Sequence, residues 1–128
     1  MMAADAVLAA LATYALMLVA FRYARRRAVH MPIMIFIMLF DLGMPVYLYL
    51  NKDWHRRLIV EGELTSLLLW THFMVLAMLY ALYVLQIGAA LRLLRGDNSA
   101  RVDHRAQGQA VLLVRAFVIV TGAMLVEW

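Results

Sequence analysis

The chain has 128 residues, and apolar and aromatic side chains make up 66% of them. Ordinary soluble domains are about 45–50% apolar, so this composition and a mean hydropathy of +0.81 predict an integral membrane protein. The absence of cysteine excludes disulfides, thiolate zinc sites and iron–sulfur clusters held by cysteine. The formal net charge of +4 does not indicate nucleic-acid binding, because arginines beside apolar segments are what orientation in a membrane requires.

Four apolar segments follow one another, and each of them predicts a membrane-spanning helix. A helix of about 20 apolar residues crosses the ~30 Å hydrocarbon layer of a bilayer. We expect a single domain with spans at about 4–22, 31–50, 66–91 and 106–126. Short polar connectors between these spans predict an all-α, four-transmembrane-helix up-down bundle.

The positions of the arginines predict the orientation of this bundle. Positive charge follows the first apolar run, Ala6 to Phe21, whereas a cleaved signal peptide carries its charge before the apolar region. We therefore expect this run to be retained as a helix. The first and third connectors carry four arginines each, while the middle connector mixes basic and acidic residues. This asymmetry predicts both termini outside and the arginine-rich loops in the cytoplasm, in a bacterial inner membrane.

One charged residue interrupts the second span and one interrupts the fourth. Asp41 and Arg115 each lie about ten residues from the arginine-rich end of their helix, which places both ~15 Å deep. Charges at that depth are costly unless they face the protein interior and are paired. We expect an Asp41–Arg115 ion pair joining the second and fourth helices. The alternative is that Arg115 binds a cofactor propionate or a lipid head group and leaves Asp41 protonated.

The four histidines of the chain fall at two levels of the predicted bundle. His30 and His104 lie at the cytoplasmic ends of the second and fourth spans, whereas His72 and His55 lie toward the outer side. Two imidazoles at one level, from different helices, are typical of bis-histidine haem b in a helix bundle. The sequence thus predicts one or two haems, held by His30 with His104 and by His72 with His55. A polar residue at the membrane interface remains the simpler reading of His55.

The methionines indicate copper as an alternative to haem iron. Met34 and Met38 follow His30 at intervals of four residues, so the three side chains share one face of a helix. Imidazole with thioethers would bind Cu(I), although methionine is also a common packing residue. A third possibility, a proton path through Asp41 and His72, has only one acid and one histidine to support it.

The order of several short motifs resembles a known family. RRRAVHMPIM opens the second span, WTHFMVLAMLY lies in the third, RVDHRAQGQ precedes the fourth, and VTG closes it. Over about residues 25–125 this order is similar to the small four-histidine membrane family that includes the cytochrome oxidase maturation factor CtaM. His30, His72 and His104 fall on matching positions, and His55 less securely. The resemblance implies a haem- or copper-handling role around a terminal oxidase, as an assembly factor or a bound subunit.

Together these features predict a haem b-binding membrane protein of respiratory electron transfer or haem–copper oxidase biogenesis. We expect its partners to be the lipid bilayer and other subunits of a respiratory or photosynthetic complex. One alternative is a cofactor-free accessory subunit of such a complex, and another is a copper-handling protein. No nucleophile–base set or carboxylate pair in a cleft is visible, so an electron-transfer or assembly role is favoured over an enzyme.

Overall fold

The chain folds into four helices that run side by side. The computed structural model describes residues 2–51, 62 and 66–125, and these residues contain no strand. The helices are α1 (Met2–Arg22), α2 (Arg27–Asn51), α3 (Leu67–Leu94) and α4 (Ala100–Met124). Each is long and apolar enough to cross a membrane. The predicted all-α transmembrane bundle is thereby confirmed.

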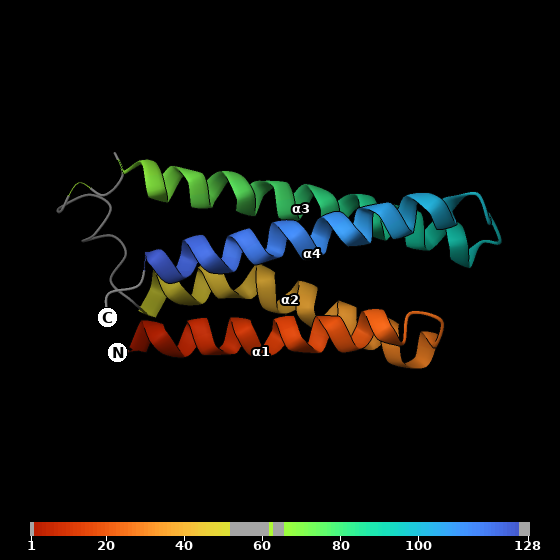
Figure 1. Cartoon of the computed structure of the whole chain (residues 1–128), viewed down its shortest axis with the longest axis horizontal. Coiled ribbons are helices and arrows are strands. Elements are labelled where there is room, and N and C mark those ends of the chain that lie inside the picture. Colours follow the sequence, from red (N-terminus) through yellow and green to blue (C-terminus); the bar gives the residue numbers. More distant parts are fainter. Residues whose placement is uncertain (1, 52–61, 63–65, 126–128) are drawn as a thin grey trace.

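Successive helices run in opposite directions. The α1–α2 and α3–α4 turns lie at one end of the bundle, and α1 begins and α4 ends at the other (Figure 1). α3 packs along α4, and α1 packs against both α2 and α4. The end with the two short turns, residues 22–30 and 92–105, carries the predicted arginine-rich connectors, and we call it the arginine-rich end. The α3–α4 hairpin reaches farther at this end than the α1–α2 turn does (Figure 1).

Three helix ends lie beyond the apolar segments that predict them. α2 begins at Arg27 rather than near residue 31, α3 continues to Leu94, and α4 begins at Ala100 rather than near residue 106. Arginine, alanine and glutamine form helix about as readily as apolar residues do. Hydropathy therefore marks the part of a helix that lipid surrounds, and not where the helix ends.

A tight turn joins α3 to α4. Gly96 adopts a φ of 93°, which a glycine reaches without steric cost and which ends α3. The amide of Gly96 donates to the carbonyl of Leu93 at 3.0 Å, and that of Asp97 donates to Arg92 at 3.0 Å. These bonds satisfy the last carbonyls of α3, and α4 starts within one turn.

The core of the bundle takes residues from all four helices. Met17, Ile37, Leu79 and Val111 come one from each helix, and each is fully buried. Most large apolar side chains outside this core are exposed on the outer faces of the helices. Lipid would cover these faces, because a bilayer solvates apolar side chains and leaves only backbone hydrogen bonds to be satisfied internally. The fold therefore fits an integral membrane protein.

Candidate cofactor site and buried ion pair

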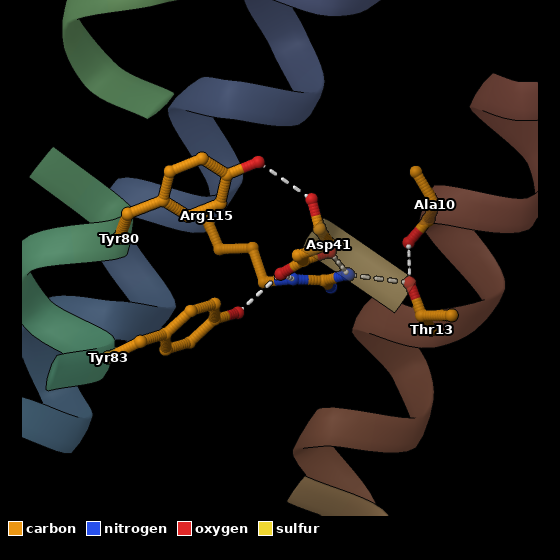
Figure 2. Close-up of polar contacts among 6 residues, drawn as sticks. All are labelled: Ala10, Thr13, Asp41, Tyr80, Tyr83 and Arg115. Carbon is orange, nitrogen blue, oxygen red and sulfur yellow. Dashed lines mark hydrogen bonds and ion pairs between the residues drawn. The ribbon is translucent and has the colours of Figure 1, made fainter. Parts of the chain in front are cut away.

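The predicted ion pair crosses the middle of the bundle. Arg115 Nε donates to Asp41 Oδ2 at 2.9 Å, and Arg115 Nη2 donates to Asp41 Oδ1 at 2.8 Å (Figure 2). The arginine is 1% exposed and the aspartate 9% exposed. Two parallel bonds of this kind are the strongest arrangement of a guanidinium and a carboxylate. The equal depth of the two residues in the sequence thus corresponds to a contact between α2 and α4.

Side chains from the other two helices complete this network. The hydroxyl of Tyr83 donates to Asp41 Oδ2, and that of Tyr80 donates to the main-chain carbonyl of Asp41 at 2.8 Å (Figure 2). Thr13 Oγ1 accepts from Arg115 Nη2 at 2.7 Å and donates to the carbonyl of Ala10 at 2.8 Å. All four helices therefore meet at one polar cluster, which we call the mid-bundle network: Thr13, Asp41, Tyr80, Tyr83 and Arg115.

Sequence reasoning missed Thr13, Tyr80 and Tyr83. A signal existed for the two tyrosines, because positions three apart share one face of a helix and a buried tyrosine hydroxyl needs a partner. Both carboxylate oxygens of Asp41 accept hydrogen bonds, Oδ1 from Arg115 and Oδ2 from Arg115 and Tyr83. The alternative in which Arg115 leaves Asp41 for another anion is not the arrangement found here. Within the described residues, no hydrogen bond links this network to His72.

At the arginine-rich end the structure brings His30 and His104 together. The two ring centres lie 6.3 Å apart, and the ring planes are inclined at 77°. His30 Nδ1 lies 2.9 Å from the carbonyl oxygen of Ala20 on α1. A carbonyl can only accept, so Nδ1 carries a hydrogen, and in a neutral imidazole the lone pair would then be on Nε2.

The His104 ring lies near the backbone of Gln86 on α3. Its Nδ1 is buried and has no hydrogen-bond partner among the described residues. His30 thus turns Nδ1 toward the main chain, and Nδ1 of His104 makes no hydrogen bond within the described residues. Metal-ligating histidines are commonly oriented this way, with the non-ligating N–H bound to a carbonyl or carboxylate.

The spacing of these rings fits a shared metal. At this separation of 6.3 Å, His30 and His104 could both be ligands of one metal ion. Among the described residues, no group of three or more histidines, aspartates and glutamates gathers in one place. Haem iron would need only His30 and His104 from the protein, because the porphyrin would supply its other ligands.

A glycine lets a flat ring approach α4 close to this pair. Gly108 lies one turn beyond His104, and a Cβ placed there would be 3.3 Å from the ring of Phe21 and 3.4 Å from Gln86 Nε2. The Phe21 ring centre is also 6.1 Å from that of His30. Gly108 therefore lets the Phe21 ring pack against α4 next to His30.

His72 lies at the other level and contacts α4. Its Nδ1 is 2.7 Å from Thr121 Oγ1, whose hydroxyl donates to the carbonyl of Phe117 at 2.8 Å and so accepts from His72. A Cβ at Gly122 would lie 3.2 Å from His72 Cε1, so the glycine admits the ring. His55 falls outside the described residues, and the His72–His55 haem site stays a prediction.

The methionines of the copper hypothesis pack in the core. Met34 is buried in the same cluster as Ile37 and Leu79, and Met38 packs against that cluster. Both side chains thus have a packing role, whether or not they bind a metal. The histidine pair is the stronger candidate for a cofactor site.

Comparison with known proteins adds nothing to this geometry. No family model, curated protein or solved structure matches the chain. The function is therefore argued from the residues themselves.

Proposed function

We propose that this protein binds haem b within the membrane through His30 and His104, and serves respiratory electron transfer or haem–copper oxidase biogenesis. One observation carries the proposal. Imidazoles from α2 and α4 lie with ring centres 6.3 Å apart, with His30 Nδ1 at the carbonyl of Ala20 and His104 Nδ1 without a hydrogen-bond partner among the described residues. A bound haem would supply one-electron chemistry that needs no substrate site.

The charge of the arginine-rich end supports an anionic cofactor. This end carries eight arginines and only two carboxylates, those of Asp97 and Asp103. The two propionates of haem are negative at neutral pH, and guanidinium groups bind carboxylates strongly. A haem at His30 and His104 would therefore sit in a favourable electrostatic field.

An absorption spectrum of the purified protein tests the proposal. We expect protein isolated from haem-replete cells to show the reduced α-band of a b-type cytochrome. His30→Ala and His104→Ala should each remove the haem held by this pair. His72→Ala is the matched control, because its ring binds Thr121 at the other level and the variant should keep that haem.

Other outcomes would identify the alternatives. Variants of His30 and His104 that keep the complete spectrum would contradict the proposed ligands. A colourless, metal-free protein would favour a cofactor-free accessory subunit of a larger respiratory or photosynthetic complex. Bound copper without haem, lost in Met34→Leu and Met38→Leu, would favour the copper-handling role.

The resemblance of the histidine order to an oxidase maturation family supports the biogenesis role. Cells lacking this protein should then assemble less spectrally intact terminal oxidase. The wild-type chain should restore the oxidase and His30→Ala should not. Normal oxidase in the deletion strain, with a haem-loaded protein, would favour electron transfer instead.

A further inference from the structure

A shallow cavity lies on the outer side of α4 at the arginine-rich end. Its volume is about 330 Å³, and its lining residues all belong to one helix: Arg101, Val102, Arg105, Ala106 and Gln109. Residues four apart share one face of a helix, so Arg101, Arg105 and Gln109 form a polar row. The α3–α4 hairpin that carries this row reaches beyond the α1–α2 turn (Figure 1).

The two arginines of the row are uncompensated by nearby carboxylates. Asp103 pairs with Arg92 at 3.3 Å, and Asp97 Oδ1 accepts from the amide of Ser99 at 3.1 Å. In the part of the chain that the structure describes, the side chains of Arg101 and Arg105 make no ion pair or hydrogen bond. Their positive charge is therefore available to an external anion.

An exposed apolar strip follows the polar row toward the bundle centre and winds around α4, because each step of four residues turns about 40°. Leu113, Phe117 and Val120 are 61%, 53% and 55% exposed. Gln109 lies between this strip and the arginines, with its amide also exposed. An amide on the lipid-facing side of a membrane helix is unfavourable unless a partner accepts its hydrogen bonds.

From these features we infer that α4 carries a binding site for an anionic phospholipid. Arg101 and Arg105 bind the phosphate, the Gln109 amide donates to an ester carbonyl, and an acyl chain lies along Leu113 and Phe117. The depths agree, because Gln109 is about 6 Å deeper along the helix than Arg105 and the head-group layer is about 5–7 Å thick. The order of cation, amide and apolar strip on α4 matches the order of phosphate, ester and acyl chain in the lipid. The inference does not depend on the cofactor.

Native mass spectrometry of the purified protein with added phosphatidylglycerol or phosphatidylcholine tests this site. The wild-type chain should retain phosphatidylglycerol preferentially. Arg101→Gln with Arg105→Gln should weaken its binding about fivefold for each arginine, or about 25-fold together. Arg25→Gln with Arg27→Gln is the matched control, because it removes the same charge at the same end away from the cavity. This control should change binding less than threefold.

A charge-neutral variant supplies a second test. Gln109→Leu should weaken phosphatidylglycerol binding about fivefold by removing one donor, and it stays informative if the arginine variant does not fold. Equal losses in the two arginine variants, or no preference for the anionic lipid, would show general attraction to membrane charge and overturn the site. Unchanged binding in Gln109→Leu would overturn the ester contact, and with it the proposed lipid pose.

Discussion

The middle of the bundle and its arginine-rich end both bury polar side chains, but the two regions differ in how many of these polar atoms have hydrogen-bond partners. In the mid-bundle network Asp41 accepts from Arg115 and Tyr83, and Thr13 both accepts and donates. Only Arg115 Nη1 lacks a partner there among the described residues. At the arginine-rich end, Gln86 Oε1, Gln107 Oε1 and His104 Nδ1 are all buried without a partner.

This difference separates a structural network from a candidate ligand site. Buried polar groups are costly unless they are hydrogen-bonded, and a satisfied network joins the helices that contribute to it. The mid-bundle network joins α1, α2, α3 and α4 at one level of the bundle. The region near the arginine-rich end leaves two buried acceptors and one imidazole nitrogen without a partner among the described residues, and such groups call for an explanation, for example an exogenous ligand.

The largest expected effect comes from breaking the ion pair on one side. Arg115→Leu leaves the carboxylate of Asp41 buried without its charge partner, and we expect a loss of about 3–5 kcal/mol in the free energy of unfolding. Asp41→Leu combined with Arg115→Leu should lose much less, because no unpaired charge remains. Unfolding by dodecyl sulfate in mixed micelles, followed by circular dichroism, measures both values. Equal losses in the single and double variants would show that the loss in Arg115→Leu does not come from an unpaired charge on Asp41.

A smaller effect distinguishes the two tyrosines of the network. Tyr83→Phe removes a hydroxyl that donates to a charged carboxylate, and we expect a loss of about 1.5–3 kcal/mol. Tyr80→Phe removes a donor to a neutral main-chain carbonyl and should cost about 0.5–1.5 kcal/mol. The same unfolding measurement compares them. A reversed order would mean that Tyr83 does not support the ion pair.

The smallest effect is expected at the arginine-rich end. Gln86 is 5% exposed and its Oε1 has no partner, so Gln86→Leu removes an unsatisfied acceptor and keeps a similar volume. In the cofactor-free protein we expect this change to be neutral or stabilising by up to about 1 kcal/mol. A loss of stability as large as that of Tyr83→Phe would show that the Gln86 side chain is hydrogen-bonded, like the side chains of the mid-bundle network.

Parts of the site were predictable because lipid makes polar residues conspicuous. Asp41 and Arg115 stand out in long apolar segments, and their equal distance from the arginine-rich end predicts that they meet. The same reasoning from depth places His30 and His104 at one level, where the structure finds their rings. Depth follows from counting residues along a helix, since each adds 1.5 Å.

Other contacts of the site could not be predicted from the depth of each residue along its helix. Thr13 and Tyr80 are ordinary residues of membrane helices, and their role depends on which way each helix is rotated about its axis. The contact of His72 with Thr121 beside Gly122 was not predicted. A close approach permitted by a glycine depends on both helices at once, so neither segment reveals it alone.

The sequence by itself determined the membrane class, the four spans and the depth of each polar residue, because the bilayer imposes one length and one polarity on every crossing segment. Only the tertiary structure decided which side chains meet, which imidazole nitrogens remain free and which acceptors stay unpaired. Those outcomes depend on the rotation and contact of neighbouring helices. That rotation and contact come from packing between side chains far apart in the chain, and not from hydropathy.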